Sequence, residues 1–248
     1  MDEFCGMGGG EMKLKILDCG ELDLKGDSFE ESLELDGLRK IDHEKRIHDL
    51  GNNCLALRNL LEGYKADTVS DYFSGIGLWA TVCVYMLKPK KLRLIDYDES
   101  CCNHLRRVFP QADVKQGDSF EILRKENKYQ LSLLDMTKCT WKTLQKSSWT
   151  DSLFNGKGDI ILSDCAGAKI HFNYGHYGLA SSNYKLYLRS YVDWVFEEFG
   201  YGCKKAVTCG GIKRPNSGYL FLSPQANTQF AIQSVNSFEA ITIKKAPN

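Results

Sequence analysis

Runs of apolar residues alternate with amphipathic runs along most of this chain, and this alternation limits the folds that the chain can adopt. Runs typical of buried strands occupy residues 67–73, 91–98, 112–118, 129–136 and 159–165. Patterns typical of helices follow them, at residues 78–88, 100–109, 120–127, 140–149 and 183–200. Strands that alternate with helices form a parallel sheet, because each helix carries the chain back to the edge where the next strand begins.

The end of this pattern differs in kind. Two extended runs, at residues 204–212 and 219–224, are joined by residues 213–218, which contain the turn sequence Pro-Asn-Ser-Gly. Two strands joined by such a turn form a hairpin and are therefore antiparallel. We thus expect an α/β protein with a doubly wound, mostly parallel, seven-stranded sheet that ends in an antiparallel hairpin.

The residues before the first core strand are expected to form an extension. Residues 12–18 alternate as a short strand, and an acidic, loop-rich stretch follows to Asp36. Residues 43–64 then have helical periodicity. The apolar face of this helix consists of Ile47, Leu50, Cys54, Leu57 and Leu61. We therefore divide the chain into a leader and helical extension packed on the core, residues 1–65, and a core domain, residues 66–248.

The charge balance, the apolar runs and the cysteine spacing indicate which kinds of partner the chain is expected to have. The 32 basic and 32 acidic residues balance, so no overall charge draws the protein to nucleic acid or to a membrane. No apolar run reaches the roughly 20 residues that span a bilayer, so we expect no membrane partner. The ten cysteines contain no Cys-x-x-Cys pair, and we expect no metal. No secretory signal precedes them, which indicates reduced thiols and a cytoplasmic location.

The sequence SDYFSGIG, at residues 70–77, follows the first core strand directly. Its two glycines, Gly75 and Gly77, lack a Cβ and allow a backbone to approach a ligand closely. The helix that begins near Leu78 turns its free N–H groups toward an anionic group. Acids also end the first three core strands, and the carboxyl ends of parallel strands meet at one edge. These features predict a site for a nucleotide-like cofactor.

The order and spacing of the elements from about Ala66 to Pro224 resemble class I S-adenosylmethionine-dependent methyltransferases, whose Rossmann-like sheet ends in such a hairpin. The sequence DYFSGIG is similar to the D-x-F-S-G-I-G motif of many DNA cytosine methyltransferases. The resemblance implies S-adenosylmethionine as cofactor. It implies cofactor contacts from Asp71, Phe73, Ser74, Gly75, Gly77, Asp96, Tyr97, Asp118 and Ser119.

The resemblance also suggests individual roles for the three acids. Asp71 fixes the glycine loop or meets the ammonium group of the cofactor. Asp96 accepts hydrogen bonds from the ribose hydroxyls, and Asp118 meets the adenine amino group. The alternative for each is a structural one, since an acid at a strand end is often a helix cap.

In the family that this chain resembles, acceptor chemistry follows the fourth strand, here LLDMTKCTW at residues 133–141. The Asp/Asn-Pro-Pro-aromatic run of amino-methylating enzymes is missing. Cys139 lies where pyrimidine-C5 enzymes carry a Pro-Cys nucleophile but lacks the proline, and Lys138 or Lys142 would lower the pKa of its thiol. Asp135 can hold the cofactor amino group or orient an acceptor proton. We take Asp135 and Cys139 as candidate catalytic residues, against a helix cap and a half-buried cysteine as alternatives.

Two further features favour a nucleic acid as acceptor. Lys138, Lys142 and Lys146 recur at the i, i+4 spacing and form a basic stripe if this segment is helical. Residues 166–184 are rich in aromatic and histidine side chains, which can stack on unpaired bases or accept protons. The candidate acceptor-binding residues are Lys138, Trp141, Lys142, Tyr174 and Tyr177, with Phe172, His171 and His176 nearby. The alternative is a packed loop beside a solvated lysine face.

Three functions therefore stay open. The first is a methyltransferase, with nucleic acid as a possible partner. The second is a catalytically inactive, methyltransferase-like binding or scaffold protein, which the unfamiliar sequence at residues 135–141 favours. The third is a nicotinamide-binding Rossmann oxidoreductase, although the third glycine of its G-x-G-x-x-G motif would fall at Ala80 and the terminal hairpin has no place in that fold. Nothing in the sequence indicates an oligomeric state.

Overall fold

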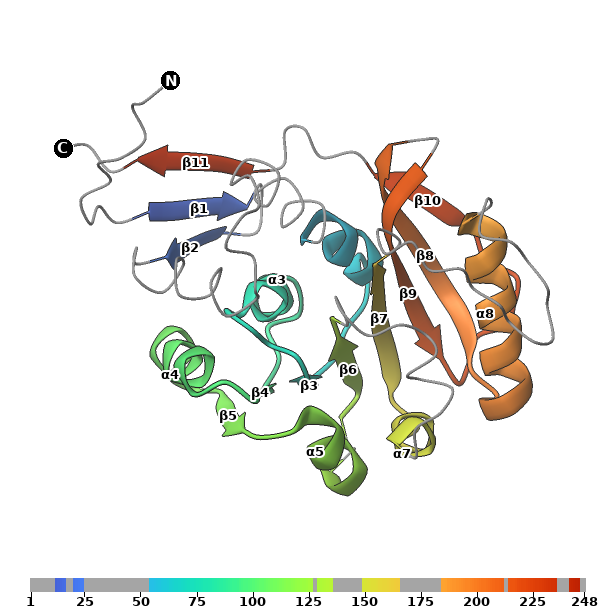
Figure 1. Cartoon of the computed structure of the whole chain (residues 1–248), viewed down its shortest axis with the longest axis horizontal. Helices are drawn as coiled ribbons and strands as arrows, with labels where there is room; N and C mark the ends of the chain where they lie inside the picture. Colours follow the sequence, from blue (N-terminus) through green and yellow to red (C-terminus); the bar gives the residue numbers. More distant parts are fainter. Residues whose placement is uncertain are drawn as a thin grey trace.

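One eight-stranded sheet lies at the centre of the molecule, with the strand order β10-β8-β9-β7-β6-β3-β4-β5 (Figure 1). The computed structural model describes residues 12–16, 20–24, 54–126, 129–135, 149–165, 184–211, 214–235 and 241–245. The strands of the sheet are β3 (Thr68–Asp71), β4 (Lys91–Asp96), β5 (Asp113–Gln116), β6 (Leu131–Leu134), β7 (Asp159–Cys165), β8 (Gly202–Gly211), β9 (Arg214–Ser223) and β10 (Ile232–Val235).

The direction of the strands follows the sequence pattern. The strands β5, β4, β3, β6 and β7 run parallel, while β9 lies antiparallel between β7 and β8. This arrangement confirms the α/β fold, the mostly parallel sheet and the antiparallel hairpin. Because the parallel strands share one direction, their carboxyl ends line one edge of the sheet, where the predicted cofactor site lies.

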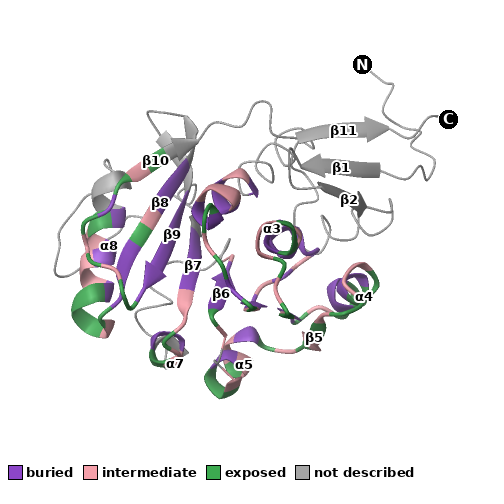
Figure 2. Ribbon diagram, turned by 180° about the vertical axis from the view of Figure 1, so that it is seen from behind, coloured by how far each residue is buried: buried purple, intermediate pink, exposed green. Residues whose placement is uncertain are grey.

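Helices cover both faces of the sheet (Figures 1 and 2). They are α3 (Leu78–Leu87), α4 (Glu99–Val108), α5 (Ser119–Glu126), α7 (Trp149–Asn155) and α8 (Tyr184–Phe199), together with the helical residues 54–61. Residues 54–61, α3 and α4 pack on one face, and α5, α7 and α8 pack on the other. The sheet is therefore doubly wound. Most of the predicted helix at 140–149 lies outside the described residues, and α7 begins at its last position, Trp149.

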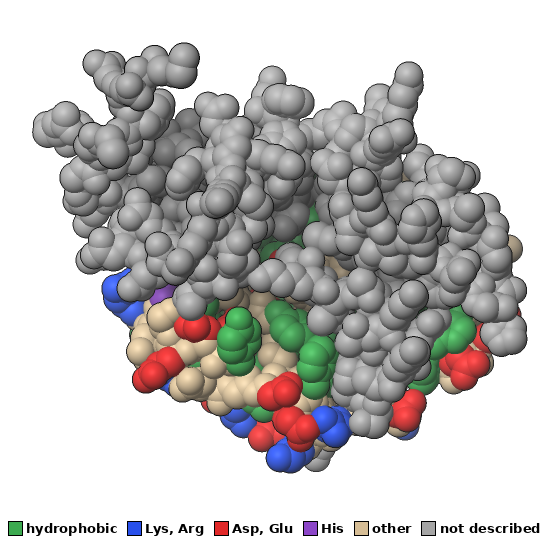
Figure 3. Space-filling model, viewed as in Figure 1, with side chains coloured by type: hydrophobic (Ala, Val, Ile, Leu, Met, Phe, Trp, Pro, Cys, Tyr) green, Lys and Arg blue, Asp and Glu red, His purple; other side chains and the backbone are tan. Residues whose placement is uncertain are grey.

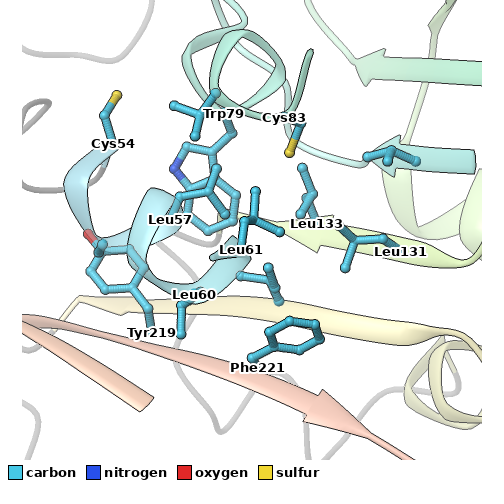
Figure 4. Packing of buried hydrophobic residues seen from close by; sticks show 14 of the residues in the cluster. Cys54, Leu57, Leu60, Leu61, Trp79, Cys83, Leu131, Leu133, Tyr219 and Phe221 are labelled. Carbon is cyan, nitrogen blue, oxygen red and sulfur yellow. The ribbon is translucent and has the colours of Figure 1, made fainter. Parts of the chain in front are cut away.

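The core separates into two layers because successive strand residues point to opposite faces. Leu133 on β6 joins the layer under α3, and its neighbour Leu134 joins the layer under α5, α7 and α8. Figure 4 shows the first layer, where the ring of Trp79 on α3 and that of Tyr219 on β9 have centroids 6.1 Å apart. Burying each leucine contributes about 1.5–3 kcal/mol. These contacts hold the ends of β3 and β6 in fixed positions.

The sheet has one strand more than the seven predicted. β10 pairs in parallel with β8 and so covers what would otherwise be an open edge of the hairpin. The strand has only four residues, Ile232–Val235, and a run that short shows no clear periodicity.

The turn predicted at residues 213–218 is wrong in extent, because β9 already begins at Arg214. Arg214 pairs with Gly211, and Pro215 pairs with Gly210 next to an irregularity in the ladder after Cys209. Proline has no N–H to give to a ladder and is tolerated at such irregular positions. The hairpin strands are thus longer than the turn residues suggested.

A second, three-stranded sheet has the order β11-β1-β2, with β1 (Met12–Ile16), β2 (Gly20–Leu24) and β11 (Ile241–Lys245) all antiparallel. The strand predicted at residues 12–18 is confirmed as β1. The loop-rich stretch predicted after it is wrong at β2, because residues 20–24 pair as an antiparallel strand with β1. Strands from both proposed segments, residues 1–65 and 66–248, pair in this sheet.

Candidate functional site

The loop between β3 and α3 is held by its own backbone and by Ser74. The N–H of Gly77 donates to the carbonyl of Ser74 at 2.7 Å. The buried hydroxyl of Ser74 donates to the carbonyl of Asp71 at 2.9 Å and accepts from the N–H of Ile95 on β4 at 3.0 Å. Ser74 therefore ties the loop to two strands through its side chain.

The two glycines of the loop have different surroundings. Both have left-handed backbones, with φ of +49° at Gly75 and +85° at Gly77, a conformation that favours glycine. A Cβ on Gly77 would lie 2.6 Å from the ring of Phe109 and 2.9 Å from the side chain of Leu105, both packed from the α4 side. A Cβ on Gly75 would meet nothing within 4 Å. Gly77 thus permits close packing of α3 on α4, and Gly75 leaves open space where a ligand could approach.

Asp96, the last residue of β4, reaches across to this loop. Its Oδ2 accepts a hydrogen bond from the N–H of Gly75 at 2.8 Å, and its Oδ1 accepts one from the N–H of Asp98 at 2.9 Å. The side chain is buried. Asp96 therefore places a carboxylate directly beside the open space at Gly75. The next residue, Tyr97, is 74% exposed and presents an aromatic ring at the same strand end.

Asp118 and Ser119 stand where β5 turns into α5. Oδ1 of the exposed Asp118 accepts from the N–H of Phe120 at 2.8 Å and from that of Glu121 at 3.4 Å, so this carboxylate caps the helix. The buried hydroxyl of Ser119 donates to the carbonyl of Tyr72. Ser119 thereby joins the start of α5 to the glycine loop.

Phe73 strengthens the same junction. Its ring meets that of Phe120 edge to face, with centroids 5.3 Å apart and an interplanar angle of 65°. Such aromatic pairs contribute about 0.5–1.5 kcal/mol beyond the area they bury. The loop after β3 is therefore anchored to β4 by Ser74 and to α5 by Phe73 and by Ser119.

Asp71, at the end of β3, is the most enclosed of the acids and is only 1% exposed. Its Oδ1 has no hydrogen-bond partner. Burial, and after it the charge of Asp135, raises the pKa of Asp71 to about 8, although the N–H of Phe73 counteracts the rise. The negative charge of Asp96 raises this pKa further. Acids from β3, β4 and the end of β6 thus lie close enough to influence one another.

Asp135 follows β6 directly and is half-buried. The hydroxyl of Ser163 on β7 donates a 2.6 Å hydrogen bond to its Oδ1. The sequence did not single out Ser163. Its only signal was its place near the carboxyl end of the fifth predicted strand, the same edge at which Asp135 ends the fourth.

The remaining sequence-based candidates lie outside the described residues. They are Lys138, Cys139, Trp141, Lys142, Lys146, His171, Phe172, Tyr174, His176 and Tyr177. On the face shown in Figure 3, the described acidic and basic side chains are interspersed. Within the described ranges, no three His, Cys, Asp or Glu side chains come together in a group that could hold a metal ion. In that same part of the chain, no helix is both long and apolar enough to cross a membrane.

Comparisons with known proteins agree with this architecture. No model of a protein family matches the chain, and no curated protein matches it either. Among solved structures, the methyltransferase domain of bacterial CtHen1-CN is similar over 71% of this chain and 97% of its own, with 14% identity and a TM-score of 0.50. Trm1 from Pyrococcus horikoshii, solved with S-adenosyl-L-methionine, is similar over 70% of this chain and 54% of its own, with 11% identity and a TM-score of 0.50. At these identities the likeness shows the fold alone, a Rossmann-like α/β sheet that this chain shares with both structures.

Proposed function

We propose that this chain is an S-adenosylmethionine-dependent methyltransferase that binds its cofactor at the carboxyl ends of β3, β4 and β5. The observation that carries the proposal is the open space at Gly75. The carboxylate of Asp96 borders this space, and Asp71 lies at the start of the same loop. The fold is shared with methyltransferase domains, and Trm1, one of these similar structures, was solved with this cofactor.

The residues present fit each part of such a ligand. The missing Cβ of Gly75 leaves a cradle, and α3 has no side-chain cap, so that the free N–H groups of its first turn suit a carboxylate. The unpartnered Oδ1 of Asp71 suits an ammonium group. Asp96 suits ribose hydroxyls, and the exposed Tyr97 and Asp118 suit the face and amino group of adenine. When bound, the cofactor supplies an electrophilic methyl group.

The nucleic-acid acceptor is the finer part of the proposal. Asp135 directly follows β6, the strand that pairs with β3. Its half-buried carboxylate can there orient an acceptor or take a proton from it. Cys139 stays the second catalytic candidate. The i, i+4 spacing of the lysines at 138, 142 and 146 and the many aromatic residues in the sequence at 166–184 support an unpaired nucleic acid as acceptor.

Two measurements test the proposal. Titration calorimetry with S-adenosylmethionine, S-adenosylhomocysteine and NADH should show binding of the first two alone. A ligand at about 100 times its Kd should stabilise the fold by roughly 2.7 kcal/mol in a thermal melt. Binding of NADH alone would instead support the oxidoreductase.

Transfer of a labelled methyl group separates the enzyme from an inactive scaffold. Single-stranded RNA, single-stranded DNA and protein fractions are incubated with labelled cofactor and the wild-type chain, or with Asp135→Ala. We expect label in a nucleic-acid fraction with the wild type and little with the variant. Cofactor binding without transfer to any fraction would favour the scaffold function.

A further inference from the structure

Within the part of the chain that the structure describes, the carboxyl of Asp71 is influenced by acidic groups and by a neutral thiol, and by no cation. Among the described residues, the titratable groups that face it are Asp135 from the end of β6, Asp96 from β4 and the thiol of Cys83 on α3. Burial and the nearby Asp71 charge raise the pKa of the Cys83 thiol well above its usual value, so this thiol is neutral. A buried carboxylate without a cation is costly, and such a group takes up a proton instead.

Asp135 differs from Asp71 in both exposure and hydrogen bonding. It is half-buried, and the Ser163 hydroxyl donates a hydrogen bond to its Oδ1. A donated hydrogen bond favours the charged form of a carboxyl, whereas burial disfavours it. Because the charge of Asp135 raises the pKa of Asp71, the two acids titrate as a coupled pair. The surroundings therefore put the charge on Asp135 and the proton on Asp71.

We propose that Asp71 holds one proton in the ligand-free protein, and that the ammonium group of an amino-acid-type ligand, entering beside Asp135, drives this proton into solvent. The inference rests on the proposed function, since S-adenosylmethionine and S-adenosylhomocysteine both carry such a group. The Asp71 carboxylic acid loses its proton to the buffer, the carboxylate that remains faces the ligand ammonium, and no bond of the ligand breaks.

The size of the effect follows from simple electrostatics. A positive charge within about 4–6 Å lowers the pKa of a carboxyl by roughly 1–3 units. Asp71 is enclosed and Asp135 is half-buried, so the ligand charge enters on the side of Asp135 and acts on Asp71 from there. The exchange therefore requires a cation within about 4–6 Å of the Asp71 carboxyl. A ligand without an ammonium group should leave the proton in place.

Calorimetry in two buffers of different protonation enthalpy measures the protons released on binding. At about pH 7, a pKa that falls from about 8 by roughly 1–3 units corresponds to the release of roughly 0.4–0.9 of a proton when S-adenosylhomocysteine binds. 5′-Methylthioadenosine, which lacks the amino-acid part, should bind without release. The Asp71→Asn variant should bind S-adenosylhomocysteine without release. The control Asp67→Asn, at the other end of β3 where Asp67 pairs with Lys90, should release as the wild type does.

Each other result has a defined meaning. Binding of S-adenosylhomocysteine without proton release, or equal release by Asp71→Asn, would overturn the inference and leave the proposed function intact. Equal release by methylthioadenosine would overturn the role of the ammonium. Infrared spectra of the ligand-free protein test the bound proton separately, through a carboxylic acid band at about pH 7 that Asp71→Asn removes. If neither nucleoside binds, the proposed function and the exchange both fail, and this band alone decides whether Asp71 holds the proton.

Discussion

The backbone N–H of Gly75 donates a 2.8 Å hydrogen bond to Oδ2 of Asp96, which joins the glycine loop after β3 to the end of β4. Asp96→Ala removes this acceptor and the carboxylate proposed to meet the ribose. We expect cofactor affinity to fall by about 1.5–3 kcal/mol, the usual contribution of a hydrogen bond to a charged group. Titration calorimetry measures the loss. Unchanged affinity in a folded Asp96→Ala protein would show that the cofactor does not meet this strand end.

The two glycines of the loop offer a matched pair of substitutions. Gly77→Ala drives a methyl group into Phe109 and Leu105, so overpacking should cost roughly 1–3 kcal/mol in addition to backbone strain. Gly75→Ala meets open space and should cost only the strain of a left-handed residue, about 1–2 kcal/mol.

Cofactor binding should respond in the opposite order. Gly75→Ala fills the proposed cradle and should weaken binding well beyond its effect on stability. Urea unfolding and calorimetry on both variants provide the comparison. If Gly75→Ala binds as tightly as the wild type, the open space beside this residue is not the cofactor site.

The raised pKa of Asp71 makes stability depend on pH. Its folded-state pKa is about 8 and its unfolded value is the usual 3.8, so the folded protein holds a proton that the unfolded chain loses. This contribution is fully present below about pH 4 and disappears as pH rises toward and through about 8. Asp71→Asn should therefore stabilise the protein at neutral pH and flatten the decline.

Unfolding in urea between about pH 6.5 and pH 8, below the range in which the buried thiols titrate in the unfolded chain, measures this dependence. That window avoids His104, whose pKa is lowered by burial and by Arg107 and which therefore destabilises the fold only at more acidic pH. An Asp71→Asn protein that keeps the full wild-type decline would show that another group holds the proton.

Nucleic-acid binding is tested by its dependence on salt. Replacing Lys138, Lys142 and Lys146 with glutamine should reduce the slope of log affinity against log salt by about 0.7–0.9 for each phosphate that the protein no longer neutralises. The exposed lysines Lys65, Lys88 and Lys91 provide a control triple of equal charge. Equal slopes for the two triple variants, with both proteins folded, would remove the nucleic-acid acceptor and point to a small molecule or a protein.

The parts of the fold that the sequence predicted correctly rest on local patterns. The alternation of apolar runs located β3 to β7 and the helices α3, α4, α5 and α8, and acids at strand ends drew attention to Asp71, Asp96 and Asp118. The parts that it missed depend on partners far along the chain. β10 exists because β8 offers an edge, and the space needed at Gly77 depends on Phe109, which the packing of α4 brings close.

The same limit applies within the site. In the sequence, Asp71 is one acid among several. The structure shows that the charges of Asp135 and Asp96 act on it and that it is buried from water. The position of Ser163 near a strand end is a weak signal, because its hydroxyl matters only through the pairing of β6 with β7 that brings Asp135 within reach.

The small sheet imposes an order on the folding of the chain. β1 and β2 are neighbours in sequence and can pair as soon as both have left the ribosome, but the third strand, β11, comes from residues 241–245. Contacts between segments so far apart in sequence form late, because a long loop must close first. Until residues 241–245 have been synthesised, β1 therefore keeps one side unpaired, and an unpaired strand edge can pair with a strand of another molecule.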